Sequence, residues 1–399
     1  MPRYLSATEA ADLLGVSKAT LYAYVSRGLI RSESLGGQSR ARRYLAEDVH
    51  KLRERKEYRR DPAQVAQDAL HWGTPLLDSS LTLITDETLY YRGYDAAELV
   101  RTCTIEQVAA LLWTGDLRGH STLFTPQVAA ETAIARLDSS LMPMQRMTIA
   151  LALADDLAAY DLRPEAVART GVRILGRLTS AATLQPFVEG GIAAHLHHAW
   201  KPDDSYIERL LDAALILCAD HELNVSSFTA RVVASADATP YAVVTAGLAA
   251  LQGIKHGGNT ERVEAFFREI GSSDRIERVT AERLRRGEYI PGFGHSLYPH
   301  GDPRAKLLLS LLAEAYPNTP EVEFVLTLAQ RVSGIIEHDA NVDFALTALA
   351  YVAHLPPGSP LALFALGRTV GWIGHAIEQY SSGALIRPRA RYVGVPPIN

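Results

Sequence analysis

The sequence predicts a mainly α-helical protein with a small N-terminal head and a larger helical body. From Asp95 onward, nearly every segment is rich in Ala and Leu at the spacing of one helix face, and Gly, Pro or Asp separates the segments. The only convincing strand pattern lies in residues 76–91, where Leu-Thr-Leu-Ile-Thr and Leu-Tyr-Tyr flank Asp86-Glu87. This pattern predicts a β-hairpin at the start of the body.

Charge separates the head from the body. Residues 1–60 contain 13 Lys and Arg against 7 Asp and Glu, a net charge of +6. The whole chain of 399 residues carries −5, so residues 61–399 carry −11. A chain of this length is expected to form two or three domains. A basic head on an acidic body predicts two separate functions.

Several classes of protein do not fit the sequence. No apolar run reaches the length of about 18 residues that a membrane span needs, and the first residues lack the form of a signal peptide. The two cysteines, Cys103 and Cys218, form no metal-binding or disulfide pattern. No phosphate-binding glycine motif of the GxxxxGK[ST] or GxGxxG type is present. We therefore expect a cytoplasmic protein without a metal site.

The head has the pattern of a helix-turn-helix. A first short helix is expected from Ser6, a break at Gly15-Val-Ser17, and a second helix from Lys18 that Ser17 caps. Residues 36–44 predict a basic hairpin or wing, and residues 46–56 another helix. Residues 3–56 resemble the winged helix-turn-helix heads of the MerR and excisionase type. The second helix of this motif presents its first residues to the DNA major groove.

If the head binds duplex DNA, its contacts fall into two groups. The expected groove contacts are Lys18, Thr20 and Tyr22, and the expected phosphate contacts are Arg40, Arg42 and Arg43. A head used only for dimerisation or for protein contacts remains the alternative, because a basic surface alone is common. A charge-dense run before Asp61-Pro62 predicts that the head ends near residue 60 and that residues 61–74 form a linker.

The body is expected to consist of amphipathic helices. Residues 105–113, 145–158, 206–220, 261–270, 305–312 and 361–379 show the helical period most clearly.

The stretch Pro291–Arg304 is the most distinctive in the chain. Its glycines and prolines predict a shaped loop, in which Asp302 caps a helix that begins at Pro303. The loop carries His295, and Arg304 falls in the first turn of the helix, where an anion is favoured. A guanidinium there can bind a carboxylate with two parallel hydrogen bonds. A plain turn before a core helix is the alternative.

Two further polar segments interrupt the apolar pattern. His256 lies in Gly253-Ile-Lys-His-Gly-Gly-Asn259, immediately before an expected helix, and Asp343 lies in Asn341-Val-Asp343, at the start of another. A helix N-terminus disfavours an imidazolium, so His256 can act as a neutral hydrogen-bond donor. Alone, His256 could be a turn residue and Asp343 an ordinary N-terminal carboxylate.

Together, these three segments resemble, in order, the signature segments of the citrate synthase family. The resemblance covers residues 75–394. Further segments that match the family are residues 91–95, 106–115, 219–224, 228–231, 364–372 and 386–394. It implies a helical body with a large domain, residues 75–253 and 356–399, and a small domain, residues 254–355. It also implies a homodimer and an acyltransferase that condenses acetyl-CoA with oxaloacetate, without a metal or redox cofactor.

The resemblance implies a role for each matched residue. Asp343 is the base that takes a proton from the acyl-CoA, His256 donates a hydrogen bond to the thioester oxygen, and His295 polarises and protonates the ketone. The expected substrate-binding residues are His221, Arg304, Arg368 and Arg387, with Arg387 reaching the partner subunit's site. The expected CoA contacts are Lys255, Gly257 and Gly294.

Four positions depart from the family pattern. Ser296 and Pro299 stand where Arg and Lys are common, Lys255 stands in place of Leu, and Ala340 in place of Pro. They lie where the acyl-CoA is expected, so 2-methylcitrate synthesis from propionyl-CoA stays open as an alternative. A transcriptional regulator whose body senses an acyl-CoA or a dicarboxylate is the other alternative.

Overall fold

The computed structural model describes residues 4–27, 29–34, 42–46, 48–49, 52, 77–124, 134–187 and 190–395. The chain divides into two compact units, residues 1–78 and 79–399. The expected linker, residues 61–74, lies outside the described residues, as does Arg40.

The first unit contains the predicted pair of short helices. Helix α1 (Ala7–Leu14) begins with a capping box between Ser6 and Glu9, and α2 (Lys18–Ser26) begins at Ser17, whose hydroxyl accepts from the Thr20 N–H. Gly15 ends α1 with a φ of 59°, a left-handed conformation that glycine adopts without strain. The two helices enclose a small core that includes Ala10, Ala11, Leu14, Leu21, Ile30, Tyr44 and Val49.

A three-stranded sheet completes this unit. Strand β3 (Arg42–Leu45) is central and pairs antiparallel with β1 (Tyr4–Leu5) and β2 (Ser32–Ser34). Strand β3 overlaps the end of the wing predicted over residues 36–44, and its partner β2 lies just before that range. The residues between them, 35–41, and most of the helix expected over 46–56 lie outside the part of the chain that the structure describes.

The second unit begins with the predicted hairpin. Strands β4 (Thr82–Ile84) and β5 (Leu89–Tyr91) pair antiparallel around the expected turn, and a short β6 (Tyr94–Asp95) extends the sheet. The Tyr91 hydroxyl is buried and donates to the carbonyl of Ile216 at 2.9 Å. The hairpin is thereby attached to the helical part of the unit.

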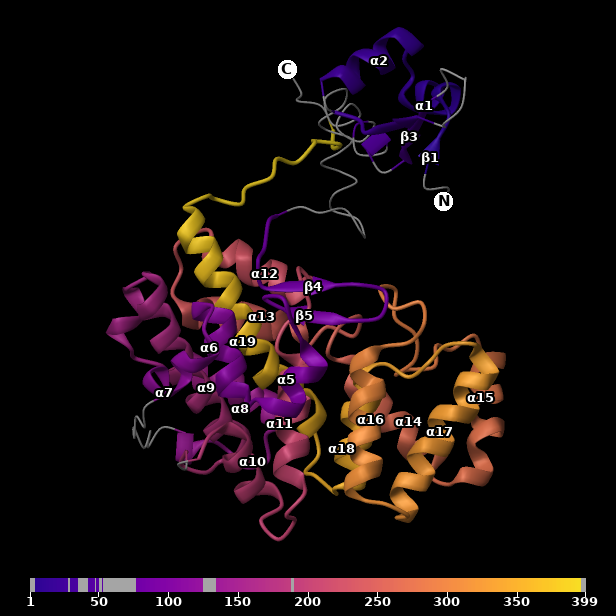
Figure 1. Cartoon of the computed structure of the whole chain (residues 1–399). Coiled ribbons are helices and arrows are strands. Elements are labelled where there is room, and N and C mark those ends of the chain that lie inside the picture. The colour runs from indigo at the N-terminus through magenta and orange to yellow at the C-terminus, as the bar shows by residue number, and fades with distance from the viewer. Residues whose placement is uncertain are drawn as a thin grey trace. The chain divides into compact units, whose positions relative to one another are not determined.

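The rest of this unit is helical (Figure 1). The helices are α5 (Ala96–Thr102), α6 (Ile105–Thr114), α7 (His120–Leu123), α8 (Pro143–Ala152), α9 (Pro164–Thr183), α10 (Ile192–Trp200), α11 (Ile207–Cys218), α12 (Val225–Ala234), α13 (Pro240–Leu251), α14 (Asn259–Ile270), α15 (Ile276–Arg285), α16 (Pro303–Ala315), α17 (Pro320–Ile336), α18 (Val342–Val352) and α19 (Ser359–Ser382). Short 3-10 turns cover Leu117–Gly119, Ile134–Arg136, Leu157–Tyr160 and Ser273–Arg275. The predicted mainly α fold is confirmed.

One helix ends earlier in the structure than the sequence predicts. The prediction over residues 145–158 fails because α8 stops at Ala152 and a separate 3-10 turn begins at Leu157. Asp156 caps this turn, and its carboxylate also binds Arg173 and Tyr241. These contacts with distant helices hold Asp156 outside a helical conformation, which the apolar period alone could not reveal.

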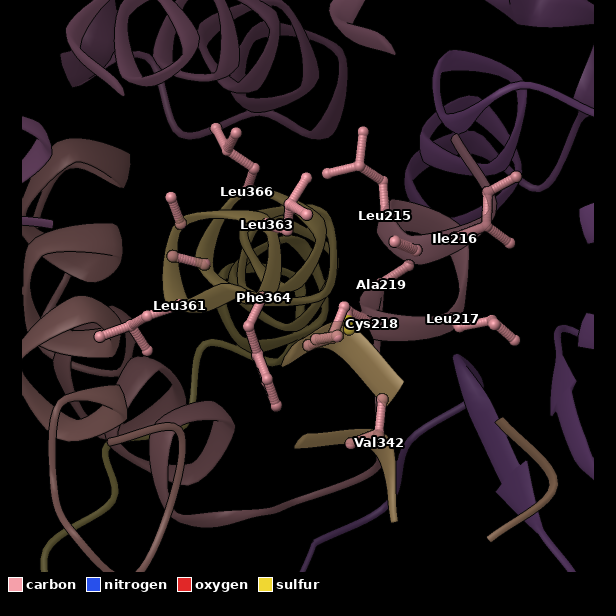
Figure 2. Close-up of a cluster of buried hydrophobic side chains, with 14 of the residues drawn as sticks. Leu215, Ile216, Leu217, Cys218, Ala219, Val342, Leu361, Leu363, Phe364 and Leu366 are labelled. Carbon is pink, nitrogen blue, oxygen red and sulfur yellow. The ribbon is translucent and has the colours of Figure 1, made fainter. Parts of the chain in front are cut away.

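Helix α19 is the centre of the body. It packs against α6, α8, α9, α11, α12 and α13, and most of its side chains are buried. Figure 2 shows residues 215–218 of α11 and the following Ala219 beside Leu363 and Phe364 of α19, with Val342 at the start of α18 near them. Buried apolar surface of this extent fixes the helices that carry the polar site.

Helices α14–α18 pack mainly on one another and form the orange group in Figure 1. They meet the remaining helices through α14 and α18 against α19, and through α16 against α11. The division into a large domain and a small domain at residues 254 and 355 stays a prediction.

Candidate active site

His221 and His295, the two histidines expected to contact oxaloacetate, lie in one ring cluster. His221 and His295 meet edge to face with ring centroids 5.2 Å apart, and both contact the ring of Tyr298. The Nε2 of His221 lies 3.0 Å from the Tyr298 hydroxyl. Burial and the positive charges of Arg304 and Arg368 lower the pKa of His221 well below its usual value. His221 is therefore neutral at neutral pH.

The tautomer of His295 follows from its backbone contact. Its Nδ1 accepts the N–H of Leu297 at 3.2 Å, so the ring proton of the neutral form is on Nε2. Burial, and then Arg304, lowers the pKa of His295 to about 4. His295 thus presents a neutral N–H donor, which suits polarisation of a carbonyl.

His256 lies in the turn before α14. Its Nε2 is 2.8 Å from Oγ of Ser226, which also accepts from Nε1 of Trp372 at 3.1 Å and contacts Oδ1 of Asn224 at 2.8 Å. The single hydroxyl hydrogen of Ser226 serves either Asn224 or His256, and this choice sets the tautomer of His256. Burial, followed by Arg368 and Arg304, lowers the pKa of His256 to about 3.

Arg304 is fixed by the residue that caps its own helix. Its Nε and Nη2 donate to the two carboxylate oxygens of Asp302 at 2.9 and 2.8 Å. The predicted cap is confirmed, because Asp302 also accepts the N–H of Arg304 at the start of α16. Asp302 further accepts the N–H of Val342 at 3.0 Å, so the same carboxylate joins α16 to the segment that carries Asp343.

Arg368 is buried with a free donor. Its Nε donates to the carbonyl of Cys218 at 2.8 Å, whereas its buried Nη2 has no partner among the described residues. A buried, unpaired guanidinium nitrogen is costly unless a ligand satisfies it. Arg368 lowers the pKa of His221, and Arg304 lowers the pKa of Arg368, so the three side chains lie near one another. Two guanidinium groups at this position suit the binding of a carboxylate.

Asp343 lies in the first turn of α18, as predicted. The side chain of Asn341 caps the helix and accepts the N–H of Asp343 at 3.1 Å. Its Oδ2 accepts from Nδ2 of Asn259 at 2.9 Å, and its buried Oδ1 has no partner within the described ranges. Burial raises the pKa of Asp343 to about 6, although the Asn259 hydrogen bond and Arg304 oppose the shift. At neutral pH, Asp343 is a mostly ionised base with one free oxygen.

Two of the three signature segments are joined through their backbones. The N–H of Gly294 donates to the carbonyl of Asp339 at 2.8 Å, the N–H of Asn341 donates to that of Gly292 at 2.9 Å, and Phe293 forms an isolated bridge with Ala340. Gly294 has a φ of 76°, a conformation that favours glycine. These contacts place the His295 loop beside the start of α18.

Most of the remaining predicted residues lie at the surface. Lys255, Ser296 and Pro299 are exposed, Gly257 is buried, and Arg387 is exposed in the segment after α19. Arg387 has no described contact with the residues of its own subunit's site. Sequence reasoning missed Ser226, Tyr298 and Asn259. The Asn-x-Ser spacing at 224–226 signals only a helix cap, so their contacts with the site depend on the tertiary fold.

The structure brings together only part of the predicted DNA-binding set, namely Tyr22, Arg42 and Arg43. Lys18 is exposed in the first turn of α2, and Tyr22 is 52% exposed. Tyr22, Arg42 and Arg43 line the same hollow of about 810 Å³. Arg43 is already engaged, because it pairs with Glu33 at 2.9 Å and lies over the ring of Tyr4, whereas Arg42 is exposed.

Comparison with known proteins agrees with this arrangement. Residues 69–389 match the family described as citrate synthase, C-terminal domain, and residues 4–57 match the helix-turn-helix domain family. Citrate synthase 2 of Bacillus subtilis (strain 168) is 32% identical over 352 residues, which are 81% of this chain and 94% of that protein. A 2-methylcitrate synthase of Mycobacterium tuberculosis is 30% identical over 333 residues, 77% of this chain and 85% of that protein.

A solved structure gives the same result. The citrate synthase of Thermotoga maritima MSB8 superposes with a TM-score of 0.69 at 29% identity, over 82% of this chain and 96% of that chain. The family match covers most of the chain, and the ordered motifs and the buried acid–base residues fall within it. The chain therefore belongs to the citrate synthase family and carries a helix-turn-helix domain at its N-terminus.

Proposed function

We propose that the body condenses a short acyl-CoA with oxaloacetate, and that acetyl-CoA gives citrate and CoA. The observation that carries this proposal is Asp343, a buried carboxylate with one unpaired oxygen and a pKa raised to about 6. A base with such a pKa is mostly ionised at pH 7 and still accepts a proton effectively.

The first step forms an enolate at the thioester. Asp343 removes a proton from the α-carbon while His256 donates a hydrogen bond to the thioester oxygen, where negative charge develops. A thioester α-carbon is a very weak acid, so the base and the donor must act together. A neutral His256 can donate through Nδ1 when Ser226 gives its hydroxyl hydrogen to Nε2.

The second step forms the carbon–carbon bond. The enolate carbon attacks the ketone carbon of oxaloacetate, and Nε2–H of His295 protonates the oxygen that becomes the hydroxyl of citryl-CoA. Arg304 and Arg368 hold the carboxylates, and the unpaired Nη2 of Arg368 supports this role. Water then cleaves the thioester of citryl-CoA and releases citrate and CoA.

The acyl group distinguishes two activities. Relatives at 32% and 30% identity are a citrate synthase and a 2-methylcitrate synthase, respectively, so the similarity supports both acetyl-CoA and propionyl-CoA as substrates. One methylene in an apolar pocket changes the transition-state free energy by only about 1–3 kcal/mol. The test compares kcat/KM for CoA release from acetyl-CoA and propionyl-CoA, each with and without oxaloacetate. No release from either one with oxaloacetate contradicts the proposed function.

We further propose that two subunits complete each active site. Arg387 is exposed in a segment whose Leu385 and Tyr392 are 61% and 74% exposed in the single chain. Apolar side chains at this exposure are typical of a surface that another chain covers. A twofold dimer would bring Arg387 of each subunit to its neighbour's site.

The head is proposed to bind duplex DNA through α2 and the wing. The match to a helix-turn-helix family and the net charge of +6 over residues 1–60 support this proposal. The site in the body favours an enzyme over a protein that only senses these ligands. A sensor would not need the free Oδ1 of Asp343.

A further inference from the structure

Asn259 contacts the carboxylate of Asp343 directly. Its Nδ2 donates to Oδ2 at 2.9 Å, and the Asn259 residue is only 8% exposed. An ionised carboxylate accepts hydrogen bonds only, so it fixes the amide with its NH₂ group toward Asp343. We propose that Asn259 is a positioning residue for Asp343, which holds one oxygen and directs the other to the α-proton of the acyl-CoA. This inference rests on the proposed role of Asp343 as the base.

The two oxygens of Asp343 have different surroundings. Oδ2 is held by Asn259, whereas Oδ1 has no partner among the described residues. The backbone of Asp343 is held separately by Asn341, whose Oδ1 accepts its N–H. One asparagine therefore fixes the backbone and a second fixes the side chain. Orientation of this kind matters because a misplaced base loses much of its rate advantage.

Asn259 and His256 belong to one rigid turn. The N–H of His256 donates to the carbonyl of Gly253 at 2.8 Å, and the N–H of Asn259 donates to that of His256 at 3.0 Å. A Cβ at Gly258 would lie 2.4 Å from the carbonyl oxygen of Gln252, so the turn is closely packed. The same turn thus carries the donor for the thioester oxygen and the clamp on the base.

The Asn259 hydrogen bond also affects the charge of Asp343. A donor to the ionised form lowers the pKa of a carboxylate, so loss of Asn259 must raise the pKa of Asp343 above its value of about 6. The other groups that face Asp343 are the lowering charges of Arg304 and Arg368, the raising charge of Asp302, and the side chains of Tyr289 and Cys218. None of these groups changes when Asn259 is replaced.

The test is the pH profile of CoA release by two Asn259 variants of the full-length protein. Asn259→Ala should lower kcat at pH 7 about tenfold or more and move the acidic limb of kcat/KM to higher pH. Asn259→Asp keeps the shape of the side chain and puts a second carboxyl group beside the first. Its acidic limb should move further, by about one pH unit or more, because the two groups cannot both ionise easily. Oxaloacetate binding, measured by calorimetry, should change less than about twofold in both variants.

The matched control is Thr260→Ala. Thr260 is buried in the same turn, and its hydroxyl donates to the carbonyl of Gly257 without contact to Asp343. This control should keep the wild-type acidic limb even if it lowers stability. The nearly isosteric Asn259→Asp protein provides the decisive profile if the alanine variant does not fold.

The outcomes separate this inference from the proposed function. If Asp343→Asn is inactive while both Asn259 variants keep the wild-type pH profile, Asn259 has no positioning role and the inference is overturned. If Asp343→Asn stays active, the proposed function itself fails. A shifted acidic limb in the Asn259 variants, absent from Thr260→Ala, supports the inference.

Discussion

The Nε2 of His375 lies 3.2 Å from Oδ1 of Asp220, and both side chains are fully buried. Glu378 lies 3.7 Å from the other ring nitrogen of His375 and also pairs with Arg231 at 2.9 Å. Asp220 immediately precedes His221, so this charged group supports the backbone beside the expected oxaloacetate site. Burial lowers the pKa of His375, but the two carboxylates outweigh it and raise the pKa to about 9.

This cluster predicts a pH-dependent contribution to stability. The interactions that raise the pKa of His375 stabilise the folded protein fully below a pH of about 6.5, the pKa of histidine in the unfolded chain. This stabilisation is lost as the pH rises through about 9, the pKa of His375 in the folded protein. Burial raises the pKa of Glu378, but His375 and the Ser80 N–H outweigh it and lower the pKa to about 2. That contribution is present above about pH 4.5 and is lost as pH falls toward 2.

His375→Gln should therefore lower the free energy of unfolding at pH 6 by about 3–5 kcal/mol, since it removes the cation beside the fully buried carboxylate of Asp220. The difference from wild type should shrink as pH rises through about 9. Urea unfolding at several pH values, followed by tryptophan fluorescence, measures this. His354→Gln, at a largely exposed position, is the matched control. An unchanged difference between pH 6 and 10 would refute a charged His375.

The pKa values of the site predict the pH dependence of activity. Burial raises the pKa of Asp343 to about 6, whereas burial keeps His256 and His295 neutral above about pH 4. The value of kcat/KM should therefore fall about tenfold for each pH unit below about 6, as Asp343 becomes protonated. A rate that stays constant from pH 7 down to pH 4.5 would contradict Asp343 as the base.

Much of the site could be predicted because its residues stand at helix starts with local signals. The sequence predicts Asp302 as the cap before Pro303 and places Asp343 in the first turn of a helix, and the structure confirms both. The contact between Asn259 and Asp343 joins residues 84 positions apart, and no local pattern encodes it. The same holds for His375 and Asp220, which meet only when α19 packs against the end of α11.

The shared active site predicts complementation between two inactive mutants. Arg387→Ala should raise the oxaloacetate KM and lower activity without unfolding the protein, and Asp343→Asn should be inactive. After subunit exchange, about half of the dimers are mixed, and each has one site with its own Asp343 and an intact Arg387 from the neighbour. Activity should approach about a quarter of wild type. No recovery after confirmed exchange would place Arg387 in its own subunit's site or outside any site.

The head predicts salt-dependent DNA binding with unequal roles for two adjacent arginines. Arg42→Ala should reduce the slope of log K against log salt by about 1, because an exposed guanidinium can release a counterion from DNA. Arg43→Ala should have a smaller effect, since Glu33 and Tyr4 already hold Arg43. Arg27→Ala is the control, because it removes one positive charge at the end of α2, outside the proposed DNA contacts. Fluorescence anisotropy with promoter-region and random duplexes measures both slope and specificity. Equal affinity for all duplexes at the same salt would contradict specific recognition.

The central claim is that Asp343 acts as the base in a condensation with oxaloacetate. The most direct test measures CoA release from acetyl-CoA and propionyl-CoA by the wild-type protein and by Asp343→Asn, with oxaloacetate binding measured in parallel. The account predicts oxaloacetate-dependent release by the wild type, a loss of at least about a thousandfold in kcat for Asp343→Asn, and nearly unchanged oxaloacetate binding. A mutant that retains a tenth of the wild-type kcat would contradict it.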